Sequence, residues 1–306
     1  MKNSANYFLK FFVLIAAILF CVGFSSKTSA NISTNPQFYQ GINSLNQQNY
    51  HQAILEFTQV IDENNQLVAS AYANRCLAHL QLNNNQAAQQ DCYQALGMNS
   101  DNIEAYLNQG IANYRLGNYP QALAAYQEVI KRNKHDYRAY YNQGLVYFQL
   151  ANYQQALSCY NQALNGHHGH FTAHKSLMYY DRALAYLKLE NFPKAIADLT
   201  HVIILNQTDE KAYYQRGYAY QKLGNYRDAF RDFTEVISLN NQLTMAYINR
   251  GITAANLGFQ QAAFKDFKIA LNQFKEQKKM KDHQQTLKLI QKIKQITAQT
   301  SQSLVA

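Results

Sequence analysis

The strongest constraint on the fold of this chain is a spacing of about 34 residues that recurs along most of its length. Segments 105–110, 139–144 and 246–251 share the pattern Ala-Tyr-x-Asn-x-Gly, and their final glycines belong to one column of small residues. That column comprises Gly41, Cys76, Gly110, Gly144, Ala183, Gly217 and Gly251. A second small column follows at Ala53, Ala88, Ala122, Ala156, Ala195, Ala229 and Ala263. The spacing predicts repeated units at about 34–68, 69–102, 103–136, 137–175, 176–209, 210–243 and 244–271.

Each unit has the pattern of two amphipathic helices joined by a short turn, such as Leu116-Gly117-Asn118-Tyr119. Small residues in the two columns let the helices of a pair approach closely. Large residues then fill the next layer, at Phe57, Tyr126, Tyr160, Leu199, Phe233 and Phe267. One pair cannot bury its own apolar faces, so successive pairs must stack on one another. The sequence therefore predicts an all-α fold of stacked helix pairs.

The unit length, the small columns, the Gly-Asn-Tyr turns and the closing aromatic residues resemble the tetratricopeptide repeat family. The resemblance covers 34–271, which is 238 of the 306 residues, but the proline that ends the family's units is missing throughout. It implies a right-handed α-α superhelical solenoid of helix hairpins with no cofactor. The function it implies is that of a non-enzymatic scaffold, which binds an extended segment of a partner protein in a concave groove. Assembly of envelope or membrane complexes is a role in which the family is used.

The two ends of the chain lie outside this pattern. Lys2 and Lys10 precede an apolar run over 11–24 and a small polar stretch, an order typical of a secretory signal cleaved after Ala30. We expect export to a periplasm, a lumen or the outside, or anchoring in the membrane if 1–30 stays uncleaved. Residues 272–299 read as one basic amphipathic capping helix, followed by a tail at 300–306. Its expected apolar side consists of Leu287, Ile290, Ile293 and Ile296.

The net charge does not favour nucleic acid as a partner. Lys plus Arg outnumber Asp plus Glu by 28 to 19, an excess of +9. Seven lysines against two acidic residues after position 271 supply +5 of that excess, so the repeated units are only mildly basic. The lysine-rich helix is expected to cap the stack, with peripheral contact to anionic lipid as the alternative.

A charge pattern between the columns predicts ion pairs inside the units. Arginine precedes the small column only in units where aspartate precedes the closing position of the second helix. Units with Ala125 or Cys159 at that place carry Gln109 or Gln143 instead of arginine. We expect structural salt bridges Arg75–Asp91, Arg182–Asp198, Arg216–Asp232 and Arg250–Asp266 between the two helices of a unit.

The expected peptide-binding site lies on the first helices of the units. A column of asparagines stands two residues before the small column, at Asn74, Asn108, Asn142 and Asn249. The resemblance gives these residues the role of an asparagine ladder, whose amides pair with an extended peptide backbone. Around them we place Tyr141, Tyr180, Tyr214, Tyr218 and Lys211. The alternatives are that the asparagines satisfy neighbouring backbone and that the tyrosines belong to the core between units.

Histidines and cysteines leave further alternatives open. A loop with His167, His168, His170 and His174 suggests a metal-binding protein, although no acidic residue or cysteine accompanies it. Cys76 and Cys92 occupy core-facing columns of one unit, where they form either a disulfide or two buried thiols, and Cys159 would be left unpaired. A membrane-anchored structural solenoid is another alternative. The sequence has no phosphate loop and no combination of nucleophile and base, so we expect no enzyme activity.

Overall fold

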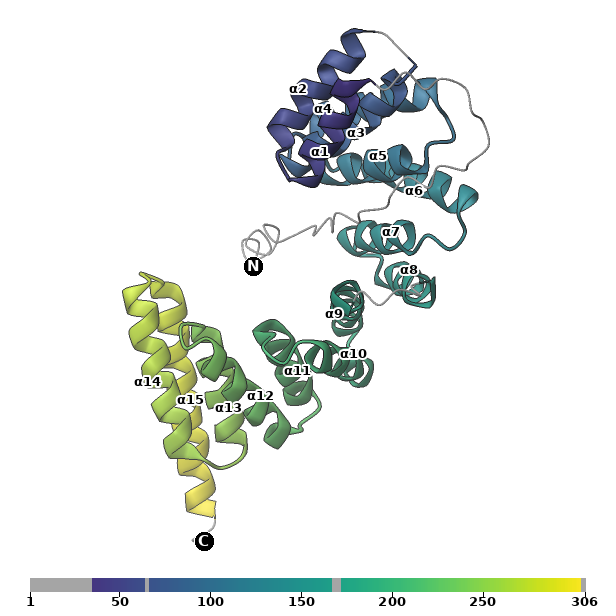
Figure 1. The fold of residues 1–306 in the computed structure, drawn as a ribbon. Coiled ribbons are helices and arrows are strands. Elements are labelled where there is room, and N and C mark those ends of the chain that lie inside the picture. Colours follow the sequence, from purple (N-terminus) through teal and green to yellow (C-terminus); the bar gives the residue numbers. More distant parts are fainter. Residues whose placement is uncertain (1–34, 64–65, 167–171, 304–306) are drawn as a thin grey trace. The chain divides into compact units, whose positions relative to one another are not determined.

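The computed structural model describes residues 35–63, 66–166 and 172–303, and every regular element in these ranges is an α-helix (Figure 1). The helices are α1 (Pro36–Asn46), α2 (Tyr50–Asp62), α3 (Val68–Gln81), α4 (Asn85–Met98), α5 (Ile103–Arg115), α6 (Tyr119–Arg132), α7 (Tyr137–Gln149), α8 (Tyr153–Gly166), α9 (Thr172–Lys188), α10 (Phe192–Leu205), α11 (Glu210–Lys222), α12 (Tyr226–Leu239), α13 (Thr244–Asn256), α14 (Gln260–Glu276) and α15 (Met280–Ser303). The chain divides into a unit that ends at Val146 and another that begins at Tyr147. The expected all-α arrangement of paired helices is confirmed.

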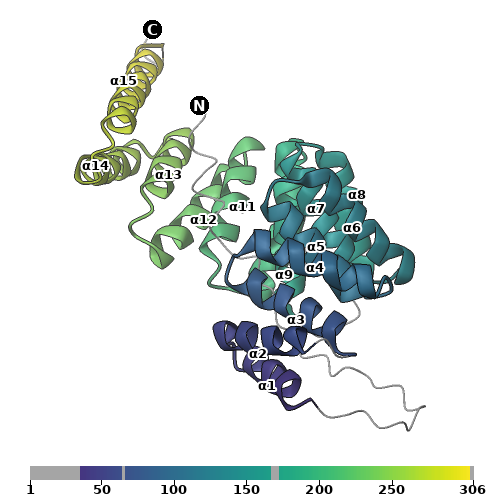
Figure 2. The same ribbon diagram turned by 90° about the horizontal axis from the view of Figure 1, so that it is seen from above.

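Hairpins are the building blocks of both units. In the first unit α1 packs on α2, α3 on α4, and α5 on α6; in the second, α9 packs on α10, α11 on α12, and α13 on α14. Within the units hairpins also pack on the next one through their second helix, as α2 does on α3, α4 on α5, α10 on α11 and α12 on α13. Figures 1 and 2 show these successive pairs from two directions. This stacking buries the apolar faces that a lone hairpin would expose to water.

The turn after each first helix has a recurring geometry. One residue of the turn adopts the left-handed conformation, which glycine tolerates best. Gly117, Gly224 and Gly258 hold this place with φ between 77° and 81°. In the other turns it is held by Gln48, Asn83, Ala151 and Glu190, with φ between 57° and 61°. The side-chain oxygens of Asn49 and Asn191 then cap the second helix by accepting the backbone N–H group three residues later.

Several hairpins are closed by an aromatic ring lying on a glycine. Tyr126 on α6 covers Gly110 on α5, and a Cβ at position 110 would come within 2.3 Å of the ring. Gly41 with Phe57 and Gly251 with Phe267 repeat this contact at 2.6 Å. These aromatic side chains are at most 1% exposed, so they form the centres of the hydrophobic cores.

The C-terminal end differs from the expected single helix over 272–299. Residues 272–276 complete α14, and α15 begins only at Met280. Lys278 lies between them in the left-handed conformation, with φ of 56°, which ends α14 as the hairpin turns end the first helices. α15 packs on α14 (Figure 2) and contributes Leu289, Ile290 and Ile293 to the core around Phe267. Leu287, which we expected on the apolar side, is 42% exposed instead.

Two further predictions concern the unit boundary at 175 and the N-terminal segment 1–30. The boundary at 175 falls inside α9, because that helix already begins at Thr172 and is about one turn longer than most first helices. The proposed signal or anchor at 1–30 lies outside the described residues. Within the described ranges no helix combines the length and the apolar character that crossing a membrane requires.

Candidate functional site

Arginine–aspartate pairs join the two helices of four hairpins. In each pair Nε and Nη2 of the guanidinium donate to the two carboxylate oxygens at 2.6–2.9 Å. The pairs are Arg75–Asp91, Arg182–Asp198, Arg216–Asp232 and Arg250–Asp266. All four ion pairs expected from the sequence are therefore present, with the two-point geometry in which such pairs are strong.

The same guanidinium groups also contact the preceding hairpin. Nη1 donates to a side-chain oxygen on the second helix of that hairpin, at 2.7–3.4 Å; the acceptors are Thr58, Asn161, Thr200 and Thr234. A tyrosine ring lies beneath each guanidinium, 5.3–5.8 Å from its centroid; the rings are Tyr72, Tyr179, Tyr213 and Tyr247. The arginine side chain thus fills the furrow between two successive second helices, which is a structural role.

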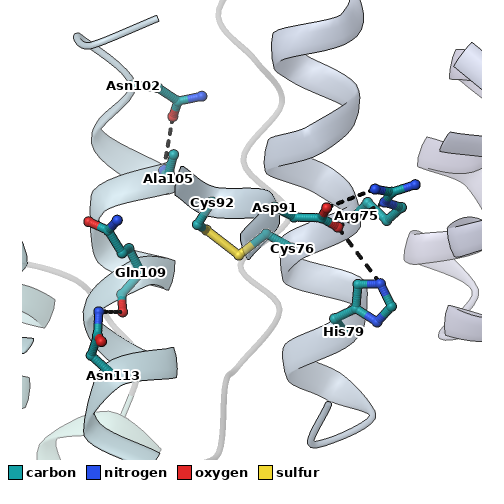
Figure 3. Close-up of a disulfide and its surroundings, with 9 residues drawn as sticks. All are labelled: Arg75, Cys76, His79, Asp91, Cys92, Asn102, Ala105, Gln109 and Asn113. Atoms are coloured by element: carbon teal, nitrogen blue, oxygen red, sulfur yellow. Dashed lines mark hydrogen bonds and ion pairs between the residues drawn. A yellow bond between two sulfur atoms is a disulfide. The ribbon is translucent and has the colours of Figure 1, made fainter. Parts of the chain in front are cut away.

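The surroundings of these pairs favour the ionised form of the arginines, whereas burial raises the pKa of the Asp232 carboxyl. Hydrogen bonds to Asp91 raise the pKa of Arg75 above its ordinary value. For Arg216, burial opposes the charge, but hydrogen bonding to Asp232 and the charge of that residue outweigh it and raise the pKa. His79 lies 3.7 Å from Asp91 (Figure 3), and burial lowers its pKa. Arg75 is therefore the cation that compensates Asp91 at neutral pH.

The asparagine column of the first unit lies on α3, α5 and α7. Asn74 is half-buried, and its Nδ2 donates to the carbonyl of Ser70 in the same helix. Asn108 is only 7% exposed. Asn142 is half-buried, and its carboxamide forms no hydrogen bond with any residue in the described ranges. Tyr141 beside it is half-buried and has a partner.

In the second unit tyrosines bind the amide of the following first helix. Asn249 on α13 donates from Nδ2 to the hydroxyl of Tyr214 on α11, at 2.9 Å. Tyr180 on α9 is likewise hydrogen-bonded to the side chain of Gln215. Burial raises the pKa of both tyrosines. These contacts fit the alternative in which the tyrosines belong to the core between hairpins.

The two remaining members of the expected site lie on α11. Tyr218 is half-buried, with Nζ of Lys222 5.4 Å from its ring centroid. Lys211 is exposed at the start of the helix.

Cys76 and Cys92 form a disulfide between α3 and α4, with their Cα atoms 5.5 Å apart (Figure 3). Cys76 occupies the column of the hairpin glycines, and Cys92 that of the closing aromatic residues. The disulfide therefore takes the place of the contact between glycine and ring, and it decides between the two alternatives that the sequence left open. Both cysteines are fully buried.

The metal-binding alternative concerns a segment that is mostly outside the description. His167, His168 and His170 lie outside the described residues, and His174 lies in the first turn of α9, where burial lowers its pKa. The described part of the chain contains no group of three or more histidine, cysteine or acidic side chains able to hold a metal ion.

Comparison with known proteins agrees with the hairpin geometry. One family model, described as tetratricopeptide repeat, matches residues 107–169 and 146–205, and a second model of the same description matches 210–242. The chain contains tetratricopeptide repeats. Such proteins are in general scaffolds for protein–protein interaction and are typically non-enzymatic. No curated protein matches the chain.

Solved tetratricopeptide repeat structures resemble the chain over most of their own length. YrrB, a tetratricopeptide repeat protein with an unusual peptide-binding site, is 22% identical, with a TM-score of 0.57 over 65% of this chain and 96% of YrrB. A repeat protein from Parabacteroides merdae is 19% identical, with a TM-score of 0.57 over 82% of this chain and 98% of that one. The C-terminal part of a repeat protein from Cytophaga hutchinsonii is 16% identical, with a TM-score of 0.65 over 80% and 98%. These likenesses establish the fold alone.

Sequence reasoning missed one feature of these repeats, a pocket between α4, α5 and α6. The available signal was the combination of Gln109 and Ala125 in the columns where other repeats carry arginine and aspartate. From the sequence alone, that combination indicates only a missing ion pair.

Proposed function

We propose that the chain is a non-enzymatic scaffold that holds an extended segment of a partner protein along Asn74, Asn108 and Asn142. The observation that carries the proposal is the carboxamide of Asn142 on a first helix, which forms no hydrogen bond with any described residue. A half-buried amide without a partner is a ready donor and acceptor for a peptide backbone. The peptide-binding site of YrrB is a precedent for such a role among repeat proteins.

The first unit suits this role better than the second. Asn249 and Gln215 each face a tyrosine hydroxyl from the preceding first helix. At the corresponding places before Asn74, Asn108 and Asn142 stand Phe38, Ala73 and Leu107, whose side chains cannot form hydrogen bonds. The amides of the first unit therefore keep hydrogen-bonding capacity that the second unit uses internally. Tyr141, on α7 beside Asn142, then serves as a flanking contact.

We further propose that this scaffold acts outside the cytoplasm, in the assembly of envelope or membrane complexes. The order of charged, apolar and small polar residues in 1–30 supports export. The Cys76–Cys92 disulfide is consistent with it, because disulfides persist mainly in oxidising compartments.

A crosslinked pull-down from the native envelope with residues 31–306 tests the binding role. The test variant changes Asn74, Asn108 and Asn142 to Ala. The matched control changes three exposed asparagines of other helices, Asn165, Asn256 and Asn272, to Ala. A partner captured by the parent and the control but lost by the test variant supports the proposal. Equal capture by all three would show that the column does not bind it.

A further inference from the structure

The furrow between successive second helices has no arginine bridge in the hairpin of α5 and α6. Where arginine is present, its guanidinium bridges the aspartate of its own hairpin and a Thr or Asn of the preceding one. In the hairpin of α5 and α6, Gln109 replaces the arginine and Ala125 the aspartate. Tyr93 on α4 takes the place of the Thr or Asn acceptor. All three members of the bridge are therefore replaced together.

A pocket of about 560 Å³ lies where the bridge is missing. α4 and α6 form its walls, and Tyr106 and Gln109 of α5 contribute to its lining. Ala125 leaves room because it has no side chain beyond Cβ. The volume falls within the range of small-ligand sites, so the pocket has space for a short segment of chain.

The lining is rich in carboxamides and tyrosines. Gln90, Gln94, Gln109 and Gln121 line the pocket, and their side chains form no hydrogen bond within the described ranges. Tyr93 is 68% exposed, although an aromatic ring in water carries a cost that a ligand would remove. The pocket therefore offers unused donors and acceptors next to aromatic surface.

The electrostatics of the pocket favour a neutral ligand. Glu128 is the one ionisable carboxylate of the lining, and Lys131 and Arg132 both pair with it. Arg132 in turn lies 4.6 Å from the centroid of Tyr106 and donates to the carbonyl of Ser100. Arg132 also lies 3.9 Å from Asp101, so the two cations are matched by two carboxylates. An ionic ligand would therefore find no free counter-charge, and its own charge would lose hydration without a compensating interaction.

We propose that this pocket binds an uncharged segment of a partner polypeptide, with the glutamine carboxamides pairing with its backbone and Tyr93 and Tyr106 packing on one apolar or aromatic side chain. Carboxamides supply both donors and acceptors, which is what a peptide backbone requires. The site is separate from the asparagine column, because none of the column residues lines it. It is therefore a second binding face of the scaffold.

The hairpins that contain the arginine bridge show which substitutions should close the pocket. Changing Tyr93→Thr, Gln109→Arg and Ala125→Asp installs the three residues that form the bridge around Arg75 and Arg216. The new guanidinium should occupy the furrow. The fold should be kept, because the same three residues coexist in the neighbouring repeats.

The experiment selects binders from a phage-displayed library of random peptides on the intact protein, then measures each peptide's affinity for the variants. We expect uncharged peptides that lose about tenfold or more in affinity for the triple variant. Tyr93→Ala, at an exposed position, should weaken them as well and tests the pocket even if the triple variant does not fold. Changing the exposed Asn165, Asn256 and Asn272 to Ala should leave their affinity unchanged.

Three results would overturn the proposal. The first is a selection that yields no peptide, or only charged ones. The second is equal affinity of the selected peptides for the parent, the triple variant and Tyr93→Ala. The third comes from a glycan array probed in parallel with the parent and the triple variant. If glycans bind the parent but not the triple variant, and no peptide shows this difference, the pocket binds carbohydrate instead.

Discussion

Phe267 lies so close to the backbone of Gly251 that a Cβ at position 251 would come within 2.6 Å of its ring. Real Cβ atoms do not approach a buried ring that closely, so Gly251→Ala must shift the ring or separate α13 from α14. We expect the substitution to lower the free energy of unfolding by about 1–3 kcal/mol, the usual range for overpacking. Urea unfolding followed by circular dichroism measures the change.

Gly97→Ala and a double variant serve as controls for this contact. A Cβ at Gly97 meets nothing within 4 Å, so this substitution should be neutral or stabilise α4 slightly. Ala183 already occupies the glycine column opposite Leu199, a smaller partner than an aromatic ring. Phe267→Leu should therefore recover part of the loss in Gly251→Ala. Equal stability of Gly251→Ala and the parent would refute the close contact.

The Arg216–Asp232 pair predicts unequal effects of two substitutions. Asp232 is 3% exposed, so Arg216→Ala leaves a buried carboxylate without its cation. Breaking a buried pair in this way costs about 3–5 kcal/mol at full burial, and we expect about 2–3 kcal/mol here because Arg216 is partly exposed. The measurement is the free energy of unfolding in urea at neutral pH.

The hairpin of α5 and α6 provides the control for the ion pair. The double variant Arg216→Gln with Asp232→Ala copies the residues found at Gln109 and Ala125. It removes both charges together, so it should cost clearly less than Arg216→Ala alone. If the double variant proved the less stable of the two, the buried carboxylate would not be the source of the loss.

The fold and the ion pairs could be predicted because the chain contains its own comparisons. Copies of the unit show which positions must be small and which charges occur together, as Arg216 does with Asp232. Periodicity of this kind reports packing between helices that are neighbours in sequence. It is therefore informative about hairpins and about contacts that every hairpin repeats.

Features that occur once were beyond this reasoning. The choice between thiols and a disulfide at Cys76 and Cys92 depends on side-chain geometry, which spacing alone does not provide. The break at Lys278 has no glycine to mark it. The pocket depends on Tyr93, Gln109 and Ala125 from three helices, and none of these residues indicates a pocket by itself. Whether an asparagine of the column is free depends on the side chain that the preceding first helix places next to it.

The Cys76–Cys92 disulfide makes the stability of its hairpin sensitive to reductant. It closes a loop with a sequence separation of 16, for which the chain-entropy model gives about 3 kcal/mol. The reduced hairpin has neither the glycine nor the aromatic ring that closes its neighbours. We expect protein refolded in excess dithiothreitol to lose about 2–3 kcal/mol of unfolding free energy, measured in urea against the oxidised form.

The control replaces the disulfide with the contact between glycine and an aromatic ring that closes the following hairpin. Cys76→Gly with Cys92→Tyr copies Gly110 and Tyr126 of the following hairpin. This variant should be insensitive to reductant and more stable than the reduced parent. A parent whose unfolding is the same with and without reductant would show that the two thiols are not joined.

The left-handed backbone conformation of Ala151 predicts that its replacement by glycine stabilises the fold. It adopts a φ of 58° at the turn position that Gly224 fills in another repeat. The left-handed conformation costs a residue with a Cβ about 1–2 kcal/mol. Glycine avoids this strain, but part of the gain is lost because glycine gives the unfolded chain more conformational entropy. Ala151→Gly should therefore raise the free energy of unfolding by about 0.5 kcal/mol, whereas Gly224→Ala should lower it by about 1 kcal/mol. Thermal unfolding of both variants checks the signs, and a loss of stability in Ala151→Gly would contradict the strain.

Cys159 should be an unreactive thiol when the protein is folded. Burial raises its pKa to about 11, and the thiolate is the form that reacts with alkylating agents. At pH 8 the folded thiol is almost entirely protonated, so alkylation by iodoacetamide should be on the order of a hundredfold slower than in urea. The rate should rise about tenfold for each pH unit up to pH 10, because the inflection lies above that range. Peptide mass spectrometry separates Cys159 from the other cysteines, and a rate that levels off near pH 8.5 would show that burial does not raise the pKa of this thiol.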